Sequence, residues 1–299
     1  MKILVTGSQG TIGKPLVKEL RSRGHIVYGC DLKHEADKNY IRCDISEYRQ
    51  IEKVLNNSFD IVINLAAEFG RQNGEEYFEA VWRTNVIGMR NILEIQKDKK
   101  FKLIQASSSE IYGDIKVDYL KEDIKPEPQL NDYAISKWVG EIQCRNFRQR
   151  YKNQIMIPRF FNAYGPGEYY TEYRSVVCLF CYKALHDLPY TVYEGYHRVF
   201  MYIGDFIPTL ANCCERFIDG ETINIGGKEY RSVKEMSDIV LKLTGKDDKL
   251  VTYLPQDQHN VVNKRPDIIK AEQLLDHAPN TSLEIGIAKT IEWMKKVYA

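Results

Sequence analysis

The chemistry available to this sequence is most visible at Tyr133 and Lys137, which stand four residues apart in Tyr133-Ala134-Ile135-Ser136-Lys137. In a helix this spacing places both side chains on one face. The pKa of an unperturbed tyrosine is about 10, and a lysine ammonium beside it favours the phenolate. We therefore predict that Tyr133 accepts a proton from a substrate hydroxyl while a hydride leaves the same carbon. Because this spacing is also common in surface helices, the pair needs support from other residues.

A serine-rich segment provides part of that support. Ser107, Ser108 and Ser109 follow a predicted strand over residues 102–106 and precede Glu110. A serine hydroxyl at this strand end can bond the substrate oxygen and share its proton with Tyr133. A serine-rich turn without a ligand is the alternative. Glu110 is either an acid/base group or an exposed carboxylate at a strand end.

A phosphate-binding turn is predicted near the N-terminus, where Gly7, Gly10 and Gly13 form a G-x-x-G-x-x-G motif between a strand and a helix. The first glycine permits a tight turn, the second lets the backbone approach a pyrophosphate, and the third lets helix and strand pack closely. The N-terminus of the helix then offers unpaired N–H groups to the phosphates. The residues of this motif expected to contact a dinucleotide are Gly7, Gln9, Gly10, Thr11, Ile12 and Gly13.

Acidic and small residues at later strand ends refine this cofactor site. Asp31 ends the second predicted strand, eighteen residues after Gly13, where a carboxylate can bond the ribose diol. It would repel a 2′-phosphate, so we predict NAD rather than NADP, although Lys33 lies nearby. Asp44 could accept from the adenine amino group or serve a helix N-terminus. The further residues assigned to the cofactor are Ile45, Leu65, Ala66 and Ala67, of which the last three also suit tight packing.

The elements that must position these groups alternate along the first half of the chain. Strands are predicted over residues 3–6, 26–30, 40–43, 61–65, 102–106 and 154–158, and helices over 13–23, 46–55, 75–96 and 133–151. This alternation indicates a parallel sheet with helices on both faces and right-handed crossovers. Open sheets of this kind bind ligands at the carboxyl ends of their strands.

The pattern loosens after Gly167, where predicted helices at 175–185, 207–217, 233–243, 271–275 and 283–297 mix with short strands. We expect an α/β, Rossmann-type doubly wound fold with a smaller mixed α/β lobe at the C-terminal end. Residues 1–165 would form an NAD-binding domain that carries the catalytic residues. Residues 166–299 would form mainly a substrate lobe, with some strands or helices returning to the first domain.

The overall composition excludes several classes of function. A net charge of +1, from 42 basic and 41 acidic residues, gives no basic face for nucleic acid. No apolar run is long enough for a membrane span, and the opening run is too short for a signal peptide. Seven cysteines without a regular framework indicate a reducing, cytoplasmic location. Cys178 and Cys181 form a C-x-x-C, but we interpret them as small hydrophobes and predict no metal.

Taken together, these residues resemble the extended short-chain dehydrogenase/reductases, in particular the NAD-dependent epimerase/dehydratase group that acts on nucleotide sugars. The likeness extends over nearly the whole chain. Besides the motifs above, it includes Thr84-Asn85-Val86, Pro158-Arg159-Phe160-Phe161-Asn162-Ala163-Tyr164-Gly165-Pro166-Gly167, Arg198-Val199-Phe200-Met201-Tyr202-Ile203, Asn224-Ile225-Gly226-Gly227 and Arg265-Pro266-Asp267.

The resemblance implies a nucleotide-diphosphate sugar as substrate and assigns roles to individual residues. Ser108 matches the catalytic hydroxyl, Ser109 and Asn162 match substrate contacts, and Asn85 matches a cofactor contact. Arg198 and Arg265 match arginines that clamp the diphosphate, which suits the guanidinium fork; a surface ion pair is the alternative for each. The resemblance also implies a homodimer formed by the two long helices. Apolar residues of the first one exceed what a single buried face requires: Phe78, Val81, Trp82, Ile87 and Ile92.

Every branch of this family begins with oxidation at C4 of the sugar, and Glu110 bears on the reaction of the resulting ketone. In 4,6-dehydratases a glutamate here removes the C5 proton, and the segment resembles the GDP-mannose version with Ser108 for its threonine. We therefore predict a 4,6-dehydratase. Ser109 replaces the aspartate of the glucose-type enzymes, which leaves the leaving-group acid unassigned.

Other branches of the family remain open. Simple C4 epimerases usually have no acid at the position of Glu110, and C3/C5 epimerases have a cysteine there. Uronic acid decarboxylases have the Ser-Glu pair and add an arginine near the position of Arg265. The closest residue to that arginine here is Lys264, and this departure argues against the branch. A catalytically silent nucleotide-binding relative is the alternative from another class, and intact Ser108, Tyr133 and Lys137 argue against it.

Overall fold

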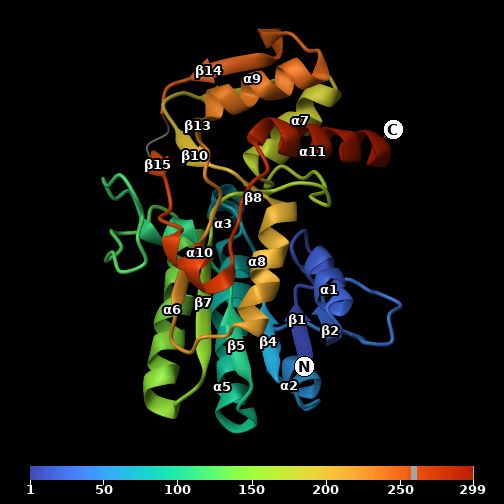
Figure 1. Ribbon diagram of the computed structural model, residues 1–299, viewed down its shortest axis with the longest axis vertical. Coiled ribbons are helices and arrows are strands. Elements are labelled where there is room, and N and C mark those ends of the chain that lie inside the picture. The colour runs from blue at the N-terminus through green and yellow to red at the C-terminus, as the bar shows by residue number, and fades with distance from the viewer. Residues whose placement is uncertain (257–260, 299) are drawn as a thin grey trace.

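The centre of the molecule is a parallel β-sheet. The computed structural model describes residues 1–256 and 261–298 (Figure 1). The main path of the sheet runs in the order β12-β7-β5-β4-β1-β2-β3, and β6 pairs with β7. Its strands are β1 (Lys2–Thr6), β2 (Ile26–Asp31), β3 (Tyr40–Arg42), β4 (Ile61–Asn64), β5 (Lys102–Gln105), β6 (Ser107–Ser108), β7 (Ile155–Phe160) and β12 (Thr222–Ile225). The strand order reverses between β1 and β4, which creates a crevice at their carboxyl ends.

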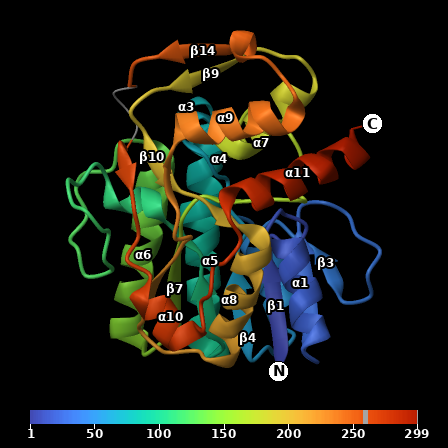
Figure 2. The same cartoon turned by 45° about the horizontal axis from the view of Figure 1, so that its top comes forward.

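Helices cover both faces of this sheet, as predicted for a doubly wound fold (Figures 1 and 2). One face packs against α1 (Gly13–Ser22), α8 (Ile203–Glu215) and α10 (Ile269–Leu275) through residues such as Leu20, Phe206 and Leu275. The other packs against α2 (Tyr48–Leu55), α5 (Met89–Lys99) and α6 (Asp132–Tyr151). Because both faces are covered, β4 is buried along its whole length, which explains its run of three apolar residues before Asn64.

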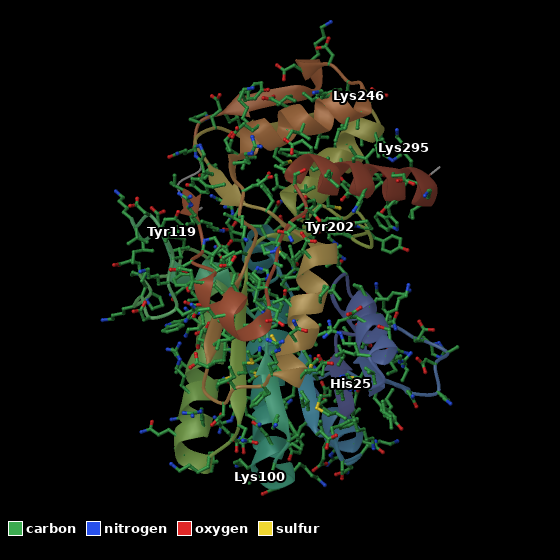
Figure 3. The ribbon with its side chains drawn as sticks, in the orientation of Figure 1. His25, Lys100, Tyr119, Tyr202, Lys246 and Lys295 are labelled. Atoms are coloured by element: carbon green, nitrogen blue, oxygen red, sulfur yellow. The ribbon has the colours of Figure 1, made fainter. Side chains whose placement is uncertain are left out.

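A second lobe lies beyond the carboxyl ends of the strands, at the top of Figure 1. It has its own hydrophobic core, to which Val177, Phe180, Val240 and Ile287 contribute. Its elements are α7 (Val176–Leu185), β9 (Tyr190–Tyr193), β10 (His197–Val199), β13 (Tyr230–Ser232), α9 (Val233–Thr244), a 3-10 turn η3 (Asp248–Leu250), β14 (Val251–Leu254), β15 (Asn263–Lys264) and α11 (Leu283–Val297). Two short strands lie where the lobes meet, β8 (Ala163–Tyr164) and β11 (Met201–Tyr202), and Figure 3 labels Tyr202 there.

The chain crosses between the two parts more than once. After α7, β9, β10 and β11, helix α8 and strand β12 rejoin the large sheet, and α10 does so again later. A division of the chain at residue 165 stays a prediction. Within residues 1–256 and 261–298, no helix combines the length and the apolar character that a membrane crossing requires.

The predicted continuous helix over residues 75–96 is wrong. The segment forms α3 (Arg71–Glu76), α4 (Phe78–Trp82), a π-helical turn η1 (Arg83–Gly88) and α5. Asn85, at the centre of η1, donates from its amide to the carbonyl oxygen of Glu68 at 2.8 Å and to Ser136 Oγ at 2.9 Å. These side-chain bonds accompany the wider turn, and π-turns inside helices are frequent at functional sites.

Candidate active site

A cleft with a volume of 820 Å³ lies where the strand order reverses. The predicted site residues that line it are Gly7, Gln9, Gly10, Thr11, Ile12, Gly13, Asp31, Asp44, Ile45, Leu65, Ala66, Ala67, Ser108, Ser109, Glu110, Tyr133, Lys137 and Asn162. The structure also describes Asn85, Arg198 and Arg265, and none of these three is among the lining residues. Most of the residues predicted from the sequence therefore line one cleft. The two arginines predicted to hold the diphosphate, Arg198 and Arg265, are not among its lining residues.

The turn after β1 has the close packing that a dinucleotide site needs. Gly7 has a φ of +65°, which glycine adopts at little cost. A Cβ at Gly13 would lie 2.1 Å from the Gly7 carbonyl oxygen, so a side chain there would push α1 away from β1. The N-terminus of α1 consequently opens directly onto the cleft, as pyrophosphate binding requires.

Two carboxylates lie at the ends of neighbouring strands in the predicted adenosine half of the cleft. Asp31 accepts hydrogen bonds from the backbone N–H of Gln9 at 3.0 Å and of Lys33 at 3.3 Å. This fixes its carboxylate while leaving lone pairs for a ribose diol. Asp44 accepts from the N–H and the hydroxyl of Ser46, at 2.8 and 2.7 Å. Asp44 thus has the local structural role that the sequence left open, and it also lines the cleft.

Asn85 connects the elements around the cleft. Besides the bonds to Glu68 and Ser136, its carbonyl oxygen accepts from the N–H of Glu68 at 2.9 Å. The side chain is 6 % exposed. Its neighbours Arg83 and Thr84 line the cleft instead. In this structure Asn85 positions the loop after β4 and helix α6.

The predicted catalytic pair lies in the first turns of α6. Burial raises the pKa of Tyr133 to about 12, although a hydrogen bond with Ser108 opposes this. Lys137 donates to the carbonyl oxygen of Ala106 at 3.3 Å, and burial lowers its pKa to about 8. The lysine ammonium was predicted to favour the phenolate. In this structure the burial of Tyr133 raises its pKa by more than the Lys137 ammonium lowers it, because Lys137 Nζ lies 5.8 Å from the centre of the Tyr133 ring.

A buried ion pair holds the serine-rich strand end in place. Arg159 and Glu141 are 1 % and 0 % exposed and form two hydrogen bonds of 2.9 Å. The same carboxylate accepts from Ser107 Oγ at 2.6 Å. Since β6 also pairs with β7, these contacts fix the backbone that presents Ser108 to Tyr133.

Glu110 forms an ion pair with Lys264, a contact between η2 (Ser109–Tyr112), a 3-10 turn, and β15. The Lys264 side chain is 3 % exposed and that of Glu110 is 21 % exposed. Burial alone would raise the pKa of Glu110, but Lys264 and Arg198 bring it below its usual range. Burial lowers the pKa of Lys264 to about 8, against the opposing effect of Glu110. At neutral pH the pair is therefore charged.

The two arginines assigned to the diphosphate have other contacts here. Arg198 donates to the carbonyl oxygens of His197 at 2.9 Å and Val262 at 2.6 Å, and also to that of Val261. Arg265 lies over the ring of Tyr119, 4.3 Å from its centre, and Figure 3 labels this tyrosine on the projecting loop before α6. The diphosphate clamp thus stays a prediction.

Residues 168–175, here called the strap, border the cleft. From the sequence this segment could be either a substrate-contacting loop or a solvated one, and none of its residues was assigned to the site. Its Glu168, Tyr173, Arg174 and Ser175 all line the cleft. Tyr173 donates to Glu76 of α3 at 2.5 Å, and the Arg174 guanidinium lies 4.9 Å from the centre of the Phe69 ring. These contacts link the second lobe to the first. The polar and aromatic composition of the strap was its only sequence signal.

Comparisons with known proteins agree with this geometry. The profile of the NAD dependent epimerase/dehydratase family matches residues 3–226. A UDP-N-acetyl-alpha-D-glucosaminuronate decarboxylase of Bacillus cytotoxicus is 29 % identical over 99 % of this chain and 98 % of its own length. A UDP-glucuronic acid decarboxylase 1 of Danio rerio is 28 % identical over 99 % of this chain and 73 % of its own.

A solved structure extends the likeness to three dimensions. The crystal structure of UDP-glucuronic acid 4-epimerase from Bacillus cereus, in complex with UDP-glucuronic acid and NAD, superposes with a TM-score of 0.91. The two chains are 30 % identical and each is covered completely. The glycine turn, Asp31 and the cleft fit this cofactor. The protein is an NAD-dependent enzyme that modifies nucleotide-linked sugars, and the chain belongs to the NAD-dependent epimerase/dehydratase family.

Proposed function

We propose that this enzyme acts on a nucleotide-linked uronic acid, oxidises its C4 hydroxyl and then releases the C6 carboxyl group as carbon dioxide. The observation that carries the proposal is the ion pair of Glu110, which lines the cleft, with the buried Lys264. Arg198 and Arg71 also lie close enough to influence the charge of Lys264, and Asp114 lies near Arg198. Arg71 is itself paired with Glu75. A cluster of this kind can bond a substrate carboxylate through its cationic side chains.

The first step uses residues that converge on the cleft. Ser108 and Tyr133 both line the cleft, and Ser108 is close enough to lower the pKa of Tyr133, so both can contact the C4 hydroxyl, with Tyr133 accepting its proton. Lys137 is on the same side of α6, where it can bond a ribose and stabilise the phenolate. Bound NAD would supply the acceptor for the C4 hydride and the donor that returns it.

The second step follows from the chemistry of the ketone. A 4-ketone places the C6 carboxylate in the β position, so the C5–C6 bond can break and leave its electron pair as an enolate. C5 must then take up a proton. Lys264, with a pKa of about 8, is a suitable donor near neutral pH. Glu110 keeps Lys264 charged and oriented until the substrate arrives.

The relatives support a uronic acid as the substrate class. The names of the Bacillus cytotoxicus and Danio rerio proteins both specify uronic acid decarboxylases, and the Bacillus cereus enzyme was crystallised with UDP-glucuronic acid. These proteins are similar along the whole of this chain. The lysine at position 264, where the decarboxylases were expected to have arginine, is the residue that most needs testing.

The 4,6-dehydratase predicted from Glu110 is the second candidate. The observation in its favour is Lys264, because this residue could protonate a departing C6 hydroxyl, a role for which the sequence offered no acid. A neutral nucleotide hexose would then be the substrate. A C4 epimerase would use the same first step and need neither Glu110 nor Lys264.

Incubation with UDP-glucuronate, UDP-N-acetylglucosaminuronate, UDP-glucose, GDP-mannose and dTDP-glucose separates these outcomes. We expect carbon dioxide and a nucleotide pentose from a uronate, identified by NMR. A 4-keto-6-deoxy product from a hexose would instead establish the dehydratase. An inverted C4 with all six carbons retained would establish the epimerase.

Substitution of Lys264 tests the residue that carries the proposal. Lys264→Met should lower carbon dioxide release about 100-fold or more, while C4 oxidation, followed as NADH absorbance, continues. Lys264→Arg is the matched control, because it retains the cation and should retain binding of the uronate. Unchanged decarboxylation by Lys264→Met would contradict the assigned role.

A further inference from the structure

Strand β12 carries a buried asparagine, Asn224, whose side chain connects elements from different parts of the site. This residue is 0 % exposed. Its side-chain oxygen accepts a hydrogen bond from Tyr112 Oη at 2.8 Å, and its amide nitrogen donates to the carbonyl oxygen of Leu120 at 2.8 Å. Its backbone N–H donates to Glu122 at 2.8 Å. The amide group supplies both the acceptor and the donor that the two side-chain bonds require.

On one side these bonds lead to Glu110. Tyr112 ends the 3-10 turn η2 that contains this glutamate. The side chain of Tyr112 is fully buried, and its hydroxyl also accepts from Arg159 at 2.7 Å. Because Arg159 is paired with Glu141 of α6, the bonds continue to the helix that carries Tyr133.

On the other side the bonds lead to Lys264. Leu120 forms a parallel backbone bridge with the segment after β15. Its N–H donates to the carbonyl oxygen of Arg265 at 2.7 Å, and its carbonyl oxygen accepts from the N–H of Asp267 at 2.9 Å. Lys264 is the last residue of β15 and directly precedes this bridge. Both members of the ion pair are therefore connected to Asn224 through short paths of backbone and hydrogen bonds.

We propose that Tyr112 and Asn224 are positioning residues that set the distance between Glu110 and Lys264 for the step after C4 oxidation. The inference rests on the proposed function, in which these two charged groups act at that step. Neither positioning residue is among those that line the cleft. They act through a buried polar network, and such a network holds its members in one arrangement when its bonds are satisfied.

The test is Tyr112→Phe, which removes the hydroxyl and retains the ring, using the substrate identified by the panel above. Arg159 keeps its two bonds to Glu141 in this variant. We expect C4 oxidation, followed as NADH formation in a single turnover, to keep its wild-type rate, because Tyr133 and Lys137 are unaffected. The step after oxidation should slow about tenfold, so that NADH and the 4-keto sugar accumulate.

A second variant reaches Asn224 from its backbone. Glu122→Ala removes the side-chain acceptor of the Asn224 N–H. Glu122 is half-buried on the loop before α6, so the sheet should form without its side chain. The step after oxidation should slow about threefold, again with an unchanged rate of C4 oxidation.

Tyr190→Phe is the matched control. Tyr190 is 3 % exposed, and its hydroxyl bonds Ser237 Oγ at 2.9 Å within the second lobe. This variant should lower the unfolding temperature about as much as Tyr112→Phe, while both steps keep their wild-type rates.

Two results would overturn the inference and leave the function standing, provided that Lys264→Met is impaired as expected. One is a wild-type rate of the step after oxidation in both Tyr112→Phe and Glu122→Ala. The other is an equal slowing of both steps, which a general loss of structure would produce. Unchanged decarboxylation by Lys264→Met would instead remove the proposed function, and this inference with it.

Discussion

Lys137 shows how function and stability conflict at a single residue. It is 8 % exposed, and burial lowers its pKa to about 8 from an ordinary 10.5. Below pH 8 the folded protein must bury an ammonium, which costs stability. Between pH 8 and 10.5 the folded state has lost the proton that the unfolded state still binds, so the cost shrinks as the pH rises and vanishes only above 10.5.

Lys137→Met should therefore be inactive but more stable. We expect C4 oxidation to fall at least about 100-fold and the free energy of unfolding at pH 7 to rise by about 2 kcal/mol. Urea unfolding at pH 7 and at pH 10 would show the gain shrinking at the higher pH. A variant less stable than the wild type at pH 7 would contradict this account.

His277 predicts a second pH effect, on stability alone. It is 3 % exposed, and burial lowers its pKa below the ordinary 6.5. Its two ring nitrogens bond Thr209 Oγ1 at 2.8 Å and the carbonyl oxygen of Gly226 at 2.7 Å. Because the folded state resists protonation, the unfolded state binds more protons below pH 6.5 and stability falls on acidification.

His277→Gln removes this titration while retaining an amide donor for Gly226. The wild type should lose stability relative to the variant below pH 6.5, by up to about 1.4 kcal/mol per pH unit. Thermal unfolding of both proteins at pH 7.5 and pH 5.5 measures the difference. Parallel losses in the two proteins would show that other groups are responsible.

At the scale of single residues, spacing along the chain could group only those site residues that are near one another in the sequence. Tyr133 and Lys137 share a helix, and Gly7 to Gly13 share one turn. Lys264 and Glu110 are 154 positions apart, so no spacing argument could connect them. The contacts of Arg198 with the carbonyl oxygens of Val261 and Val262 were hidden for the same reason.

The strap is the element whose contacts most directly concern access to the cleft. On the side of the second lobe, Tyr170 stacks on Tyr182 with ring centres 3.8 Å apart, and its N–H donates to Tyr298 Oη at 2.7 Å. On the side of α3, the bond from Tyr173 to Glu76 lies at the surface. The weaker attachment is therefore the one to α3.

Tyr173→Phe should loosen the strap without altering the chemical groups. We expect NADH to dissociate about threefold to tenfold faster, with C4 oxidation of bound substrate unchanged. Stopped-flow fluorescence measures the release. Tyr253→Phe removes a comparable hydrogen bond, to Asp248 at 2.6 Å, far from the cleft, and should release NADH at the wild-type rate. Equal rates in all three proteins would count against the strap.

Element predictions succeeded where hydrophobic periodicity was undisturbed. Helix α11 has its predicted bounds, and α6 begins one residue early because Asn131 caps it. The helix predicted over 75–96 is interrupted at Tyr77, whose φ of −130° and ψ of 50° are not helical. Residues 83–88 then form a π-helical turn, in which Asn85 bonds a loop and another helix. Hydrophobic periodicity indicates which face of a helix is apolar. It does not indicate where the bonds of a polar side chain change the helical turn.

At the scale of the whole molecule, an apolar surface on α4, η1 and α6 has no cover within the described chain. Phe78, Trp82 and Ile87 are 60 %, 45 % and 45 % exposed, and Ile142 of α6 is 48 % exposed. By contrast, Val81 and Ile92 of the predicted surface are buried. Exposed apolar side chains gathered on adjacent helices are typical of an interface between subunits.

We predict a homodimer through this surface. Trp82→Glu combined with Ile142→Glu should give a monomer at micromolar concentration in light scattering, whereas the wild type gives twice that mass. Ile269→Glu is the control, because this residue is 56 % exposed on α10, which covers the opposite face of the sheet. A wild-type protein that is monomeric at this concentration would remove the prediction.

The alternation of strands and helices was enough to predict the doubly wound sheet, because parallel strands with crossovers permit few arrangements. The same pattern could not predict where the last strand pairs. Thr222 to Ile225 alternate polar and apolar residues over a short segment, and only the completed sheet shows their place beside β7.

The late position of β12 in the chain has a consequence for folding during synthesis on the ribosome. Sixty-five residues separate Phe160, the end of β7, from Ile225, the end of β12. At ordinary rates of translation the growing chain waits roughly 3 to 13 s with β7 as an open edge. An unpaired edge is a template for other chains, so the emerging polypeptide is most prone to misassembly in that interval, before its own β12 can occupy the place.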